Sequence, residues 1–113
     1  MMNNMTGIVV KLQHEATHFW ENADSIPEVS FLKHPHRHIF HITLLKEVSH
    51  DDRDIEIIQM KRQVQEYLQK QYGRNFGGKS CEMIARELLE LYGCLSVEVL
   101  EDGENGAFVT NGK

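Results

Sequence analysis

Histidine is the residue type whose placement in this chain points most directly to chemistry, because six of the seven histidines lie between residues 14 and 41. His36 and His38 are separated by a single residue. In a β-strand both side chains therefore project from one face, about 6.6–6.8 Å apart along the chain. Two imidazoles at that spacing can converge on one metal ion with bonds of about 2.0–2.1 Å. Taken alone, the pair also fits two polar side chains on a solvated strand face.

A third histidine is expected near this pair. Apolar and polar residues alternate from Ile8 to Phe19, which is the period of a half-buried strand, and His14 and His18 fall on its apolar face. The face that carries His36 and His38 continues with apolar residues at positions 40, 42 and 44. If the two strands are antiparallel neighbours, a third imidazole lies beside the pair. Three neutral histidines with an open fourth position are typical of a catalytic zinc site.

The other histidines carry weaker signals. His41 is predicted to face the opposite side of its strand from the pair, as a packed or surface residue. His34 and His50 fall in loop-like sequence. Either could act as a proton shuttle, and the alternative for both is a surface histidine.

The periodicity of the sequence predicts the elements that must hold these side chains. Four strands are predicted, over Ile8–Phe19, His36–Val48, Leu95–Glu101 and Ala107–Thr110. Two helices are predicted between the second and third strands, with apolar stripes at Ile57, Met60, Val64 and Leu68 and at Ile84, Leu88 and Leu91. Gly73 and Gly93 are expected to end the helices, Ser80 to cap the second, and Gly77–Gly78 to form a flexible break. Asn22–Lys33 is expected to be an ordered loop and Ser49–Asp54 a charged turn.

Length and composition favour one globular domain over residues 1–113, with its core at about residues 8–110. The chain has 113 residues, of which 41% are hydrophobic and 26% charged. Its net charge of −5 argues against DNA or an anionic membrane as partner. Cys81 and Cys94 are expected to be reduced and buried, and no signal peptide or membrane span is recognised, so we expect a cytoplasmic protein.

Several short motifs occur in the order found in one known family. They are Glu15-Ala16-Thr17-His18-Phe19, Pro35-His36-Arg37-His38-Ile39-Phe40, Asp54–Lys61, Ser80-Cys81-Glu82-Met83 and Val97-Glu98-Val99-Leu100-Glu101-Asp102. Together they resemble the 6-pyruvoyltetrahydropterin synthase and 6-carboxytetrahydropterin synthase family, over roughly Ile8 to Val109. Each motif is weak alone, and the order of all five is what makes the resemblance specific.

The resemblance implies a tunnelling fold, which is an antiparallel four-stranded sheet with two helices on one face in the order β-β-α-α-β-β. It implies that His18, His36 and His38 bind zinc and that Glu101 holds the ligand, a pterin- or deazapurine-type heterocycle. A carboxylate suits that task because it accepts two N–H bonds from a 2-amino-4-oxo ring edge. The resemblance also implies a homo-oligomer with the ligand between subunits. Without it, Glu101 would be interpreted as a polar residue at a strand end.

The chain departs from the family at its proton-transfer residues. Val29–His34 contains no cysteine where the family has a catalytic one, and Gln71–Gly78 contains no Asp-His pair. Cys81 begins a helix, where the dipole could lower its pKa, although we favour a structural thiol. Ser30, His34 or His50 would have to replace the missing groups, and His34 is the candidate catalytic base. Two hypotheses follow: a zinc-dependent lyase of the pterin synthase type, or a non-catalytic module that binds or sequesters a purine- or pterin-like ligand. A protein that only assembles, with vestigial histidines, is a third.

Overall fold

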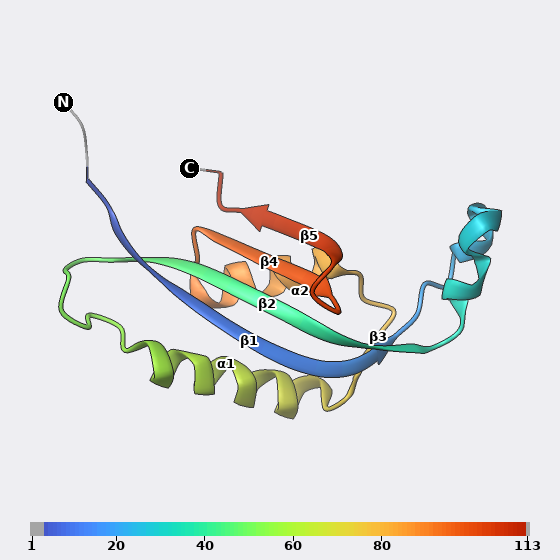
Figure 1. Ribbon diagram of the computed structural model, residues 1–113, viewed down its shortest axis with the longest axis horizontal. Coiled ribbons are helices and arrows are strands. Elements are labelled where there is room, and N and C mark those ends of the chain that lie inside the picture. The colour runs from blue at the N-terminus through green and yellow to red at the C-terminus, as the bar shows by residue number, and fades with distance from the viewer. Residues whose placement is uncertain (1–3, 113) are drawn as a thin grey trace.

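The computed structural model describes residues 4–112 and contains one five-stranded open sheet, in the order β3-β1-β2-β4-β5. The strands are β1 (Thr6–His18), β2 (His36–Val48), β3 (Asn75–Gly77), β4 (Ser96–Glu101) and β5 (Asn105–Thr110). The helices are α1 (Ile57–Tyr72) and α2 (Cys81–Tyr92), with two short 3-10 helices, η1 (Ala23–Ser25) and η2 (Pro27–Lys33). The predicted α+β class is confirmed, and Figure 1 shows α1 running along β1 and α2 behind the sheet.

The predicted four-stranded antiparallel sheet is not confirmed as such, because the observed sheet has five strands and β3 pairs in parallel. β1 pairs with β2, β2 with β4, and β4 with β5, all antiparallel. β3 pairs in parallel with the end of β1, where Gly77 has a positive φ of 63°. The predicted flexible break at Gly77–Gly78 is therefore partly strand. Three residues are too few to show an alternating pattern, so this strand had no sequence signal.

One hydrophobic core joins the sheet to both helices. Leu12, Ile42 and Val99 are cross-strand neighbours on the same face and are almost fully buried. Val64 of α1 and Leu88 of α2 are fully buried in the same cluster. This core fixes which face of the sheet is covered, and the even-numbered histidines of β1 and β2 lie on that face.

The helix ends confirm the predicted caps, but two stripe residues were placed wrongly. The Ser80 side chain accepts a hydrogen bond from the Met83 amide, and Gly73 and Gly93 follow the two helices. Ile57 and Leu91 were predicted to face the core, but they are 46% and 51% exposed. Leu89 is buried in place of Leu91, because α2 packs with a face rotated toward β4 and β5.

The expected loop between β1 and β2 contains η1 and η2. Figure 1 shows this segment as an arm that projects beyond the ends of the two strands. Exposed apolar side chains, including Ile26 and Phe31, lie on it. In the described residues no helix is long and apolar enough to cross a membrane.

Candidate metal centre

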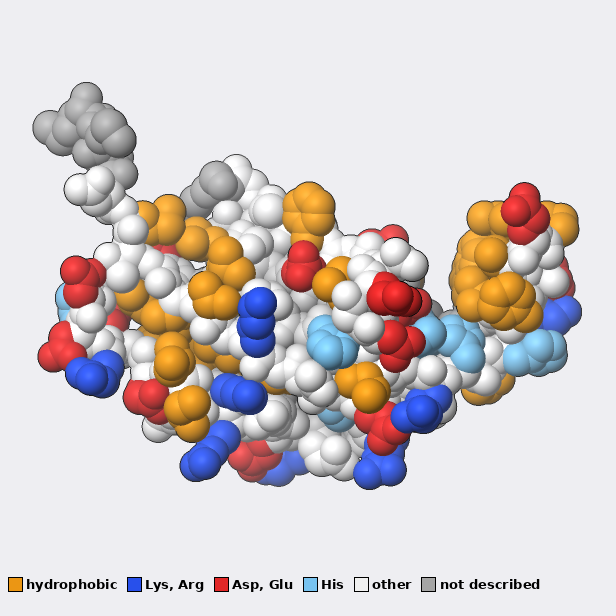
Figure 2. Space-filling model, in the orientation of Figure 1, with side chains coloured by type: hydrophobic (Ala, Val, Ile, Leu, Met, Phe, Trp, Pro, Cys, Tyr) orange, Lys and Arg blue, Asp and Glu red, His pale blue; other side chains and the backbone are white. Residues whose placement is uncertain are grey.

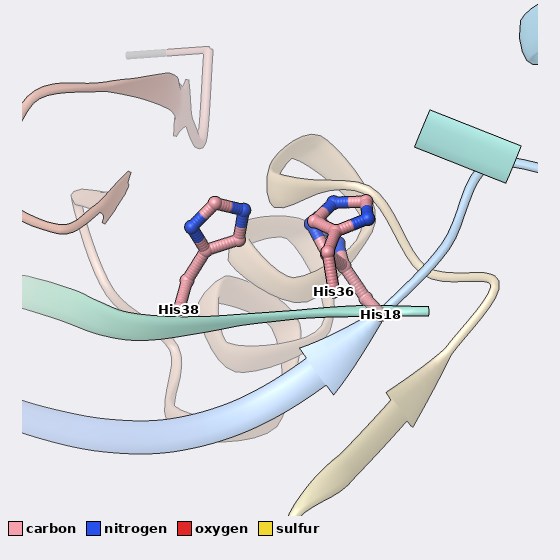
Figure 3. Close-up of side chains that lie close together, drawn as sticks. All are labelled: His18, His36 and His38. Carbon is pink, nitrogen blue, oxygen red and sulfur yellow. The ribbon is translucent and has the colours of Figure 1, made fainter. Parts of the chain in front are cut away.

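The three histidines meet because the register of β1 and β2 aligns them. His18 lies directly opposite His36, and His38 lies opposite Ala16, two positions further along the same face. The ring centroids are 4.6 Å apart for His18 and His36, 5.3 Å for His18 and His38, and 5.0 Å for His36 and His38. One ring nitrogen from each lies within 4.8 Å of the others. Figure 3 shows all three rings rising from the same side of the two strands.

Each ring is oriented by an acceptor at its Nδ1 atom. The Nδ1 of His18 is 2.9 Å from the Lys79 carbonyl oxygen, and that of His36 is 2.8 Å from the His34 carbonyl oxygen. The Nδ1 of His38 is 2.8 Å from Oδ2 of Asp102. Because carbonyl and carboxylate oxygens only accept, each Nδ1 donates its hydrogen, and the lone pair of the neutral ring lies on Nε2. Metal-binding histidines in proteins are held in this way.

The Nε2 atoms of His18 and His38 are buried and have no hydrogen-bond partner. A buried polar atom without a partner is costly unless an ion or water satisfies it. Burial lowers the pKa of His18, and the nearby His36 and His38 lower it further, against the opposing effects of Lys79 and Glu101. The ring is therefore biased toward the neutral form that a metal requires. These residues fit a divalent cation that accepts imidazole ligands.

Glu101, at the end of β4, brings a carboxylate to the same place. It pairs with Phe40 across the sheet and so shares the face of the histidines. Its Oε2 is 3.1 Å from Nε2 of His18, and its Oε1 is 3.5 Å from Nε2 of His38. The Cys81 thiol lies 3.7 Å from Oε2. Burial and the neighbouring Glu101 raise the pKa of Cys81 to about 12. The thiol therefore keeps its proton and can donate a hydrogen bond to the carboxylate.

Asp102 supports the site through its backbone conformation. It has a positive φ of 55°, which is uncommon for a residue other than glycine, although aspartate is among those that tolerate it. In this position its Oδ1 accepts from the Ile39 amide at 2.9 Å while Oδ2 accepts from His38. The hydrogen bond from the Ile39 amide and that from His38 lower the pKa of Asp102. One carboxylate thus ties the turn after β4 to the strand that carries two of the histidines.

A cavity of about 510 Å³ opens beside the histidines. Its lining includes His18, His36, Cys81, Glu101 and the aromatic ring of Trp20. This size falls within the usual range for small-molecule sites, and the mixture of apolar walls with a few polar groups is typical of them. Figure 2 shows histidine side chains gathered between the body and the projecting arm, with acidic side chains beside them. A larger hollow of about 920 Å³ over α2 contains no histidine.

The other predicted histidines lie outside this cluster. His34 has an exposed side chain that does not line the cavity, and its contribution to the site is the backbone carbonyl that orients His36. The His14 ring packs against Phe76, and its Nε2 atom lies 2.6 Å from the carbonyl oxygen of Gly73. His41 lines a different cavity, and His50 lies 3.6 Å from Asp54.

Sequence reasoning missed the residues that orient the three histidine rings. Asp102 was treated only as the end of a motif, although the Asp102-Gly103 pair is a turn signal that places a side chain at the end of β4. Cys81 and Cys94 are reduced and buried as predicted, but the contact between Cys81 and Glu101 had no signal. The Lys79 carbonyl is a backbone group and could not be recognised from residue type.

Comparison of the chain with models of protein families found no match. Comparison with curated protein sequences also found none.

Proposed function

We propose that this protein binds one Zn²⁺ ion through the Nε2 atoms of His18, His36 and His38. The observation that carries the proposal is that every ring donates from Nδ1 to a fixed acceptor, while one ring nitrogen of each histidine lies within 4.8 Å of the others. Three imidazoles suit zinc among the available divalent metals. His36→Ala should abolish stoichiometric zinc while leaving the circular dichroism spectrum unchanged. Undiminished zinc in that variant would remove the site.

We further propose that the site serves a pterin-, deazapurine- or purine-like heterocycle, as the resemblance to the tunnelling-fold pterin synthases implies. Two observations support this: a cavity of about 510 Å³ beside the histidines, and a half-buried carboxylate, Glu101, on its wall. A carboxylate can accept two N–H bonds from a 2-amino-4-oxo ring edge, while Trp20 offers an apolar wall. Bound zinc would supply Lewis acidity toward a carbonyl or hydroxyl of the ligand.

Calorimetric titration with neopterin- and guanine-type compounds tests the heterocycle proposal. Glu101→Ala should weaken binding by about 1–3 kcal/mol, because the ligand's N–H groups lose a charged partner. Glu98→Ala is the matched control, since Glu98 lies on the same strand with its side chain exposed on the other face. Absence of binding to the wild-type protein would refute the assigned role of Glu101.

The non-catalytic alternative is favoured by a specific observation about proton-transfer groups. Of the two cysteines, only Cys81 lines the cavity, and its pKa of about 12 keeps it protonated. The His34 side chain points to solvent and would have to reorient to act as a base. General acid–base groups typically contribute about 10²–10⁴-fold each, so a site without them is better suited to binding, sequestering or delivering a ligand.

A turnover assay separates the lyase from the binding module. Zinc-loaded protein is supplied with dihydroneopterin triphosphate, and loss of the triphosphate or side chain is followed. Ordinary enzymes turn over at about 1 s⁻¹ or faster, and we expect turnover by this protein to be well below that rate. Turnover at or above that rate would refute the binding module, and its loss in His34→Ala would identify His34 as the base.

We also propose that the protein is a homo-oligomer. The sheet is open, and β5 occupies one edge with Phe108 71% exposed. Exposed strand edges are usually paired or covered. Native mass spectrometry of the purified protein would report assembly size, bound metal and any co-purified heterocycle together, and a monomer at micromolar concentration would contradict the proposal.

A further inference from the structure

The Glu101 carboxylate lies close to two of the three histidines, His18 and His38, while the group of ligand atoms within 4.8 Å of one another contains only the three histidines. Its oxygens lie 3.1 Å from Nε2 of His18 and 3.5 Å from Nε2 of His38. Bonds of about 2.0–2.1 Å to a tetrahedral ion separate neighbouring ligand atoms by about 3.3–3.4 Å. The two observed separations lie on either side of that value.

These contacts do not have the geometry of hydrogen bonds. Neither Nε2 atom has a hydrogen-bond partner, although the carboxylate is so near. The Nδ1 atoms of both rings already donate to Lys79 and Asp102, so each neutral ring carries its lone pair on Nε2, within 3.5 Å of a Glu101 oxygen. Two lone-pair-bearing atoms at this separation repel each other unless a cation lies between them. The arrangement is therefore that of donors surrounding a shared positive charge.

We propose that Glu101 is the fourth ligand of the resting metal site, which makes the site closed rather than open. The inference rests on the proposed metal binding, but not on the identity of any heterocycle. The protonated Cys81 thiol, whose sulfur lies 3.7 Å from Oε2, helps to hold the carboxylate by donating a weak hydrogen bond to it.

A closed site changes what a ligand must do in order to bind. Any group that takes the fourth position, or any N–H edge that pairs with the carboxylate, must first draw Glu101 off the metal. Heterocycle binding and opening of the metal are then coupled. A ligand with N–H donors at one edge and an oxygen or nitrogen donor at another is favoured, because it satisfies the carboxylate and the metal together.

The test uses Co²⁺ in place of zinc, because its visible absorption reports ligand number and identity. Azide serves as a small probe that binds an open metal position. Co²⁺-loaded wild-type protein should respond to azide only at high concentration. Glu101→Gln and Glu101→Asp should each bind azide at least about tenfold more tightly. Glu101→Asp keeps the negative charge but is one methylene shorter, so it separates loss of a ligand from loss of charge.

Controls make each outcome decisive. Glu98→Gln removes a carboxylate from the exposed face of the same strand and should behave as wild type. X-ray absorption at the zinc edge should show one more oxygen contributed by the protein in wild type than in Glu101→Gln. Equal azide affinity in wild type and Glu101→Asp would overturn the inference while leaving the three-histidine site intact. Failure of wild type to bind Co²⁺ or Zn²⁺ would overturn both.

Discussion

Asp102→Asn is expected to weaken zinc binding about 10–100-fold, although Asp102 does not touch the metal position. Its carboxylate accepts from the Ile39 amide and from Nδ1 of His38 at the same time. An asparagine can offer only one oxygen. If that oxygen keeps the Ile39 amide, the NH₂ group faces Nδ1 of His38 and favours the tautomer with hydrogen on Nε2, which cannot bind a metal through Nε2. If the amide is flipped, the backbone N–H of Ile39 loses its acceptor.

The magnitude corresponds to about 1.4–2.8 kcal/mol of binding free energy. The fold should survive, because asparagine tolerates the positive φ of 55° found at this position. Zinc affinity is measured by competition with a chromophoric chelator, and folding by circular dichroism. Asp52→Asn, in the exposed turn between β2 and α1, makes the same chemical change far from the site and should have no effect. Zinc affinity unchanged in Asp102→Asn would refute the idea that Asp102 fixes the His38 tautomer.

Three further predictions concern the fold around the site. Because burial lowers the pKa of His18 in the folded state, the unfolded chain takes up this proton first. The stability of the metal-free protein is therefore full above about pH 6.5 and falls below it, and denaturant titrations should show a smaller fall in His18→Gln. Leu88→Ala should lower the free energy of unfolding by about 2–5 kcal/mol, because Leu88 is fully buried. The matched change of Leu91, which is 51% exposed, should cost within about 0.5 kcal/mol, and equal losses would contradict the observed face of α2. Gly106→Ala should cost at least about 1–3 kcal/mol by thermal unfolding, since its Cβ would lie 1.8 Å from the Val99 carbonyl oxygen, and an unchanged melting temperature would contradict that contact.

The sequence by itself was sufficient for the long elements and for the identity of the clustered histidines. β2 begins and ends where its β-branched and aromatic residues predicted, and Ser80, Gly73 and Gly93 mark helix ends because their local backbone chemistry hardly depends on distant contacts. The H-x-H spacing places two rings on one face of any strand. The resemblance to the pterin synthases and the role it gives Glu101 stay predictions.

Tertiary structure alone decided the parts that depend on long-range contacts. Whether His18 meets His36 is set by the register between two strands, and hydrophobic alternation fixes a face but leaves shifts of two residues open. β3 exists only because β1 offers it a partner, so its three residues have no pattern of their own. The contacts that orient the rings come from the Lys79 and His34 carbonyls and from Asp102, 64 residues from His38. Backbone oxygens carry no residue-specific signal, and a turn aspartate becomes a histidine partner only when folding brings the end of β4 beside the start of β2.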